Sequence, residues 1–468
     1  MQAATFLAYL AAAALFVLGI RRLRRPETAR SGNTLAAFGM VIAFLATLFV
    51  IQFQGLLLIG AATLLGAVVG AVSAQRVQMT AMPQMVAAYN GVGGGAAALI
   101  ALSEFYHLQI QGDESIVAAI TVPLTVLIGS VSFAGSVVAF LKLQEIAFTG
   151  SVVFPLQQVV NVILFVGILV LGANAALDAA ILPFLPPVAS VTAVLVASLV
   201  LGVLLVIPIG GADMPIVISL LNAFTGLAAA ASGFVLENYI LIIGGTIVGA
   251  SGTILTRLMS SALGRPLRKI IFAGIAASGG GKGEDQEERP VNDASAETVG
   301  EYLKDEAEKI VIVPGYGLAV AQAQTAMRDL VDALEAEGKE VLFGIHPVAG
   351  RMPGHMNVLL TEAGVPYEKL YDLEDINPEF DDTDAAIIVG ANDVVNPAAD
   401  DPEQDTPISG MPILEVEKAE RIIFIKRSLS PGFAGVDNPL FYDTDKTMML
   451  FSDAKQGLQE VVEAVKNG

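Results

Sequence analysis

The chain has 468 residues, which leaves room for two or three domains. Hydrophobic residues make up 54% of it and charged residues 15%, a balance typical of membrane proteins. With no cysteine, disulfides, thiolate catalysis and thiolate metal sites are excluded, and three histidines argue against a histidine-rich metal site. The net charge of −20 disfavours nucleic acid as a partner, because like charges repel.

The charge is divided unevenly along the chain. Residues 1–275 carry 11 Lys and Arg and 8 Asp and Glu, a net of +3. Residues 276–468 carry the other 15 Lys and Arg and 38 Asp and Glu, a net of −23. We therefore expect an apolar membrane half joined to a very acidic soluble half.

The first half contains nine apolar stretches long enough to cross a bilayer, which takes roughly 20 residues. They lie near residues 4–20, 34–52, 55–72, 84–102, 116–140, 157–175, 188–208, 215–234 and 239–260. An odd number of spans puts the two ends of the chain on opposite sides. If the C-terminal half is cytoplasmic, all eleven positive charges of residues 1–275 fall inside, as the positive-inside rule requires. The sequence thus predicts a multi-pass cell-membrane protein with its N-terminus outside.

Polar side chains within the spans are informative, because their burial in lipid is costly. They serve either as interhelical hydrogen bonds or as a water-lined proton route, and both interpretations stay open here. No Asp, Glu, Lys or His lies deep in any predicted span. The candidates are Asn90, Ser132, Ser136, Asn161 and Asn222.

The remainder of the chain divides into a linker and a soluble domain, which gives predicted boundaries of 1–262, 263–308 and 309–468. Residues 276–296 are rich in glycine and charge, as flexible linkers are. Beyond them, short apolar runs alternate with amphipathic segments, which predicts a Rossmann-like α/β domain with a parallel sheet. We expect strands at 309–314, 340–346, 384–390 and 421–426, and helices at 318–338, 353–364 and 452–467.

The first strand of that domain leads into the motif Gly315-Tyr316-Gly317-Leu318-Ala319-Val320. Glycines between a strand and a helix allow a tight turn and the close approach of a pyrophosphate, although a plain tight turn also uses them. Val320 replaces the third glycine of the usual pattern.

Two further positions favour NADP over NAD. The second strand runs into a loop with Arg351, where NAD-specific sites place an acid. The strand at 421–426 ends in Lys426-Arg427-Ser428. Two cations and a hydroxyl suit a 2′-phosphate, and the alternative is a solvated basic turn.

These blocks resemble the NADP(H)-binding domain of proton-translocating NAD(P) transhydrogenases. The resemblance rests on VPGYGLAVAQAQ (313–324), FGIHPVAGRMPGHMNVLL (343–360), VGANDVVNPAA (389–399), GMPILEV (410–416), IKRSLSPGFAGVDNPLF (425–441) and MLFSDAK (449–455). The membrane half is similar to the family's beta subunit in its nine spans, in MPQMV (82–86) and around Asp213 and Asn222.

The resemblance implies a subunit that binds NADP(H) and contributes to a proton channel. Hydride would pass between NAD(H) and NADP(H), coupled to proton translocation, with NAD(H) held by a separate alpha subunit. The partners implied are that subunit, the lipid bilayer and a second copy of this chain within a larger complex. Hydride transfer between two nicotinamides requires no catalytic side chain and no metal. The competing functions are an NADP-gated secondary transporter and a membrane NADP sensor.

The same resemblance implies the site residues by motif position. Asn90 stands where some relatives carry a histidine, and Phe433 where related members often carry a tyrosine. The cofactor-binding set is Gly315, Tyr316, Gly317, Val320, Ala349, Gly350, Arg351, Asn392, Asp393, Lys426, Arg427, Ser428, Gly432, Phe433, Ala434 and Gly435; the proton path is Asn90, Asn222 and Asp213.

Overall fold

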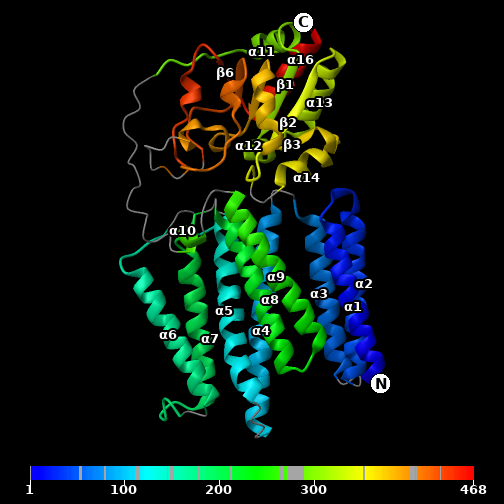
Figure 1. Cartoon of the computed structure of the whole chain (residues 1–468), viewed down its shortest axis with the longest axis vertical. Coiled ribbons are helices and arrows are strands. Elements are labelled where there is room, and N and C mark those ends of the chain that lie inside the picture. The colour runs from blue at the N-terminus through cyan, green and yellow to red at the C-terminus, as the bar shows by residue number, and fades with distance from the viewer. Residues whose placement is uncertain are drawn as a thin grey trace. The chain divides into compact units, whose positions relative to one another are not determined.

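The computed structural model describes the chain apart from a set of short ranges. These are residues 1, 52–54, 79–80, 112–115, 145, 148–151, 178–179, 211–212, 263–266, 272–288, 351–353, 401–405, 407, 433 and 468. The chain divides into two compact units, Met1–Thr256 and Arg257–Gly468 (Figure 1). The predicted boundaries at 262 and 308 stay a prediction.

The first unit is helical, and within its described ranges nine helices are long and apolar enough to cross a membrane (Figure 1). Each coincides with one predicted span, so the multi-pass helical fold is confirmed. The helices are α1 (Gln2–Leu23), α2 (Pro26–Val50), α3 (Leu56–Arg76), α4 (Met82–Gln111), α5 (Ile116–Leu143), α6 (Gln157–Ala176), α7 (Pro187–Val206), α8 (Met214–Val235) and α9 (Tyr239–Ala262).

Glycines let these helices approach backbone to backbone. A Cβ on Gly129 of α5 would lie 2.6 Å from the carbonyl oxygen of Gly94 in α4. Likewise, a Cβ on Gly245 of α9 would lie 2.6 Å from the carbonyl oxygen of Gly226 in α8. Small residues of this kind bring helices together where the hydrophobic effect cannot, because lipid is itself apolar.

The second unit is built on a six-stranded sheet in which every strand pair is parallel. The strand order is β3-β2-β1-β4-β5-β6, so the chain reverses direction across the sheet between β1 and β4. This confirms the Rossmann-like fold, and ligands of such sheets bind at that reversal, beyond the carboxyl ends of the strands. The strands are β1 (Lys309–Pro314), β2 (Glu340–Ile345), β3 (Leu370–Asp372), β4 (Ala385–Val389), β5 (Arg421–Lys426) and β6 (Thr447–Phe451).

The two faces of the sheet are covered differently. Ile310 and Ile312 of β1 point to the face packed by helices, which are α11 (Ala296–Asp305), α13 (Gln324–Ala336), α14 (His355–Glu362) and α16 (Ala454–Asn467). Val311 and Val313 point to the other face, where short 3-10 turns and loops supply the apolar cover, Phe380 and Phe441 among it. This face carries long connections, and they form part of the site.

The expected helix at 318–338 is divided in two. α12 (Tyr316–Val320) ends where Gln322 takes a left-handed backbone with φ of 50°, and α13 begins at Gln324. The Ala323 amide then donates to the Leu318 carbonyl at 3.0 Å, the six-to-one bond of a Schellman helix end. Gly338, with φ of 81°, caps α13 as expected.

The linker prediction missed an ordered approach to the sheet. α11 begins at the cap Ser295, whose hydroxyl accepts from the Thr298 amide at 3.2 Å. Just before it, the chain runs beside β6, where the Met449 amide donates to the Asn292 carbonyl at 2.8 Å. The strands β3 and β6 were also not foreseen. Residues 272–288 of the predicted linker lie outside the described residues.

Candidate functional site

Three glycines meet where β1 and β4 part, and we call them the glycine crevice: Gly315, Gly317 and Gly390. The Gly315 amide donates to the Val389 carbonyl, and the Gly317 amide to the Gly390 carbonyl, both at 2.9 Å. A Cβ on Gly315 would lie 2.5 Å from the Ala391 Cα, and one on Gly390 would lie 2.5 Å from the Gly317 Cα. Gly390 also has φ of 65°, which favours glycine. The crevice therefore tolerates no side chain at these positions.

Gly390 was missing from the predicted site. It closes the fourth strand within the block VGAND, and its signal was a glycine at the end of a buried strand. Of the other predicted turn residues, Tyr316 is half-buried, whereas the Val320 side chain is 53% exposed.

Asn392 follows β4 and holds an unused hydrogen-bond donor. Its side chain is 8% exposed, and its Oδ1 accepts from the Asn438 Nδ2 at 3.0 Å. Asn438 is itself fixed, because its Oδ1 accepts from the Leu440 amide at 3.1 Å. The Asn392 Nδ2 has no partner among the described residues. A buried amide donor of this kind is costly unless an acceptor such as a ligand oxygen completes it.

Asp393 ties the glycine-rich loop 432–435 to the end of β4. Its Oδ2 accepts from the Ala434 amide at 2.9 Å. A Cβ on Gly432 would lie 2.7 Å from the Asp393 Cγ, so the loop backbone lies directly against the carboxylate. Gly435 turns the loop with φ of 71°. Phe433 lies outside the described residues.

The end of β5 places a cation beside the same loop. The Lys426 Nζ donates to the Ser430 carbonyl at 2.5 Å and lies 4.2 Å from the centre of the Phe441 ring. Burial lowers the pKa of Lys426 to about 8, while the carboxylates of Asp393 and Asp437 act in the opposite direction.

The next two residues of this strand end, Arg427 and Ser428, are exposed, and the Ser428 hydroxyl donates to the Ser430 hydroxyl at 3.0 Å. The strand end therefore offers one half-buried amine and, beside it, an exposed guanidinium and hydroxyl.

The loop after β2 reaches the turn of the glycine crevice. Gly350, with φ of 103°, packs so closely that its Cβ would lie 2.7 Å from the His355 Cβ. The His355 ring in turn lies 6.3 Å from the Tyr316 ring, centre to centre. Ala349 is buried at 3% exposure, and Arg351 lies outside the described residues.

His346, in the same loop, is held as a neutral ring. Its Nε2 donates to the Pro412 carbonyl at 2.7 Å, and its Nδ1 accepts from the Val348 amide at 3.2 Å. Burial lowers its pKa to about 4. The ring therefore braces the loop, and it does not change charge near neutral pH.

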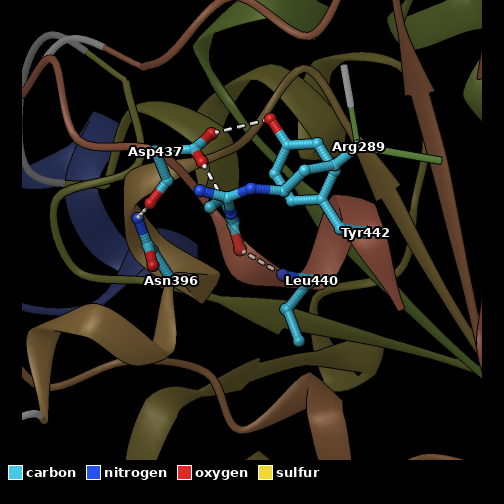
Figure 2. A network of polar contacts seen from close by, with 6 residues as sticks. Arg289, Asn396, Asp437, Leu440 and Tyr442 are labelled. Atoms are coloured by element: carbon cyan, nitrogen blue, oxygen red, sulfur yellow. Dashed lines mark hydrogen bonds and ion pairs between the residues drawn. The ribbon is translucent and has the colours of Figure 1, made fainter. Parts of the chain in front are cut away.

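A polar network joins Arg289 to Asn396, Asp437 and Tyr442 (Figure 2). The Arg289 guanidinium lies 3.5 Å from the Asp437 carboxylate and 4.8 Å from the centre of the Tyr442 ring. The Tyr442 hydroxyl donates to Asp437 at 3.1 Å, and Asn396 Nδ2 donates to the Asp437 carbonyl at 3.0 Å. Burial and the Asp437 carboxylate raise the pKa of Tyr442. Sequence patterns gave no signal for this network, whose partners are far apart in the chain.

In the helical unit, Asn90 is the centre of a buried hydrogen-bond cluster. Its Nδ2 donates to the Ser136 hydroxyl at 3.0 Å and to the Ser132 hydroxyl at 3.4 Å. Ser132 also contacts the Thr225 hydroxyl at 2.6 Å and donates to the Leu221 carbonyl at 2.8 Å. We call Asn90, Ser132, Ser136 and Thr225 the Asn90 cluster; it joins α4, α5 and α8.

The other two predicted proton-path residues lie on α8, Asp213 at its N-cap and Asn222 directly after Leu221, whose carbonyl accepts from Ser132. Asn222 is half-buried on α8 and takes no part in the cluster's bonds among the described residues. Asp213 is buried at the N-cap of α8, eight residues before Leu221, or about 12 Å along the helix. The structure thus groups Asn90 with serines and a threonine, and places the acid at a helix end.

Comparison with known proteins adds the family. The family model described as NAD(P) transhydrogenase beta subunit matches residues 5–464. Two proteins from Rhodospirillum rubrum, both named NAD(P) transhydrogenase subunit beta, are each 45% identical to this chain over 472 residues. The match covers 98% of this chain and 99% of each of those proteins.

Proposed function

The chain belongs to the NAD(P) transhydrogenase beta-subunit family, and from this premise we propose that it binds NADP(H) and couples hydride transfer to proton translocation. Hydride would pass between NADP(H) on this chain and NAD(H) on an alpha subunit. The proposal takes the chain to be a multi-pass membrane protein whose residues 309–468 hold the nucleotide.

The observation that carries the cofactor proposal is the meeting of three features at one edge of the sheet. The glycine crevice lies at the strand-order reversal, where dinucleotides bind. Asn392 offers a buried donor there, and Lys426 offers a half-buried amine on the neighbouring strand. A pyrophosphate fits the glycine crevice. A 2′-phosphate fits Lys426, Arg427 and Ser428, because charged hydrogen bonds to phosphate are strong.

When bound, the nicotinamide supplies the hydride chemistry, so the chain contributes binding, orientation and the exclusion of water. The loop 432–435 is suited to cover the nucleotide, since Asp393 holds it at the end of β4 through the Ala434 amide. Gly350 and His355 would support the opposite wall through their close packing. None of these residues needs to act as an acid, base or nucleophile.

The partners follow from the same proposal. The names of the relatives specify a beta subunit, so an alpha subunit would bring NAD(H) to the nicotinamide held here. The described residues form one sheet of dinucleotide-binding type, which leaves the second nucleotide to that partner. We further propose a pair of beta subunits within the complex, with the nucleotide domain in the cytoplasm and the N-terminus outside.

The proton route would pass through the Asn90 cluster. An asparagine amide does not titrate, so Asn90 would orient water rather than carry the proton itself. Its two serine partners hold the amide across α4 and α5, while Thr225 extends the cluster to α8. Asp213 and Asn222 are the further candidates on α8.

The proposal is tested by proton uptake in vesicles that contain this chain and its alpha subunit, during reduction of NADP+ by NADH. A pH change that follows hydride transfer and disappears with a protonophore supports the coupled enzyme. Hydride transfer without a pH change would refute coupling. Tight NADP+ binding with neither hydride nor proton movement would instead indicate an NADP-gated transporter or sensor.

A further inference from the structure

Helices α5, α6 and α7 carry four buried polar side chains with atoms that lack hydrogen-bond partners among the described residues. These atoms are the Ser130 hydroxyl, the Gln157 Oε1, both amide atoms of Asn161 and the Ser198 hydroxyl. Each of these residues is 5% exposed or less. In a membrane interior an unpaired polar group is strongly unfavourable, so a partner is required.

Two of these residues share one face of α6. Gln157 and Asn161 are one helical turn apart, and the same stripe continues through the buried Ile168. On α7, Ser198 lies on the buried stripe between Val194 and Leu201. Residues three or four apart share a helix face, so the two stripes present these polar groups to the interior of the three helices.

Two hydrogen bonds fix the register of α6 against α7. The Gln157 Nε2 donates to the Leu204 carbonyl at 3.0 Å, and Asn174 Nδ2 donates to the Ser190 hydroxyl at 2.8 Å. The helices are therefore antiparallel, and Asn161 lies level with about residue 201. Ser198 is three residues from that level, or about 4.5 Å along the axis.

A close contact fixes α5 against α7 in the same way. A Cβ on Gly202 would lie 2.6 Å from the Val131 carbonyl oxygen and 3.0 Å from the Ala134 Cβ. Lys142 bonds the end of α7, so α5 and α7 run parallel. Ser198, four residues before Gly202, is thus within about one turn of the level of Ser130. The four residues form a column that runs along the three helices.

The two ends of this column differ. At one end the Lys142 Nζ donates to the carbonyls of Ile207 and Ile209, at 2.6 and 2.8 Å. That end is polar, and it is the end at which α7 finishes and α6 begins. At the other end lies a layer of buried aliphatic side chains. The layer contains Val122, Val126, Ile168, Val191 and Val194.

We propose that α5, α6 and α7 enclose a water-filled recess lined by Ser130, Gln157, Asn161 and Ser198. It opens at the Lys142 end and stops at the aliphatic layer. Water is the fitting ligand because one molecule both donates and accepts, as the two amide atoms of Asn161 require.

The recess also suggests a role, which rests on the proposed function. Ser130 is two residues from Ser132, so the recess reaches the depth of the Asn90 cluster on the other side of α5. It would supply water to that cluster from the side of the membrane on which the chain continues into residues 257–468.

The chain has no cysteine, so single-cysteine variants report without background. Asn161→Cys and Ser198→Cys are assembled with the partner subunit in vesicles and treated with the water-soluble reagent aminoethyl methanethiosulfonate. Labelling is followed by the mass of this chain. The matched controls are Ile168→Cys, 1% exposed and within the aliphatic layer, and Ile163→Cys, 66% exposed on the outer face of α6. The reagent reacts with thiolates, which form in water and not in lipid.

We expect at least tenfold faster labelling of Asn161→Cys and Ser198→Cys than of either control. Equal rates at all four positions would overturn the recess. A second measurement uses Asn161→Leu, because removal of a dry, unpaired amide raises the melting temperature of the complex. A water-bonded amide predicts no such rise. Neither readout requires hydride transfer, so loss of transhydrogenation with labelling intact would count against the proposed function alone.

Discussion

Replacement of Lys426 by methionine should weaken NADPH binding while the fold is kept. The amine donates to the Ser430 carbonyl and lies over the Phe441 ring, so its charge is already held at the strand end before any ligand arrives. A hydrogen bond to a charged group contributes about 1.5–3 kcal/mol. That corresponds to a dissociation constant raised about 10- to 150-fold in the variant.

The pH dependence gives this prediction its sign. Burial lowers the pKa of Lys426 to about 8, so the amine is charged below that pH and progressively neutral above it. A bound phosphate favours the charged form and raises this pKa, so the complex holds more protons than the free chain. Affinity therefore falls as pH rises through 8, by up to about tenfold per pH unit until the pKa of the complex is reached.

The assay is a calorimetric titration of the purified chain with NADPH, repeated at several pH values between 7 and 9.5. The phosphate is then mostly dianionic, since its second pKa is about 6. The matched control is Lys446→Met, which removes an amine bonded to the carbonyls of Glu417 and Ala419, before β6. NADPH affinity within twofold of the unmodified chain, or a fall above pH 8 that persists in Lys426→Met, would refute the reasoning.

Three further outcomes follow from the described contacts. Gly390→Ala would force a Cβ against the Gly317 backbone, so we expect thermal unfolding to show a free energy of unfolding lowered by about 1–3 kcal/mol, and we expect no NADPH binding. The control Gly338→Ala, whose Cβ would meet nothing within 4 Å, should cost only its backbone strain of about 1 kcal/mol. A double-mutant cycle of Arg289→Gln and Asp437→Asn should give a coupling free energy of about 0.2–1 kcal/mol, because the ion pair is partly exposed. In stopped flow, NADPH release should accordingly be accelerated at most about fivefold. Asn90→Leu should abolish proton uptake by vesicles yet retain hydride exchange between bound nucleotides; full proton uptake would remove Asn90 from the route.

Local sequence patterns predicted the elements well where one segment decides its own structure. The run KIVIVP is apolar and ends at a glycine turn, and β1 spans the same residues. The nine spans were predicted equally well, because length and hydropathy are enough to identify a helix that crosses lipid. The break after α12 was not predicted, because the left-handed backbone at Gln322 interrupts a continuous helical pattern and no glycine or proline marks it.

The site was less accessible to such reasoning because its contacts join distant segments. Arg289 and Asp437 are 148 positions apart, and only the fold places them together. Gly390 approaches Gly317 because β4 lies beside β1, an order that the sequence alone did not specify. Asn392 was predicted through motif resemblance and Lys426 from the basic residues at its strand end, but the unpaired donor of the first and the lowered pKa of the second depend on burial.

If Lys426 binds the cofactor phosphate as proposed, the charges around it explain how so acidic a domain would bind an anionic cofactor and still release it. The carboxylates of Asp393 and Asp437 favour the protonated amine against the effect of burial, so they help to keep the positive charge of Lys426 in place. The same carboxylates would repel a nearby phosphate, so affinity is moderated by the groups that maintain the site. Asp393 also holds Ala434 of the loop, and Asp437 holds Arg289. A change in the charge or position of either carboxylate would therefore act on the loop and on a bound phosphate together, which is what the proposed cycle of nucleotide binding and release would require.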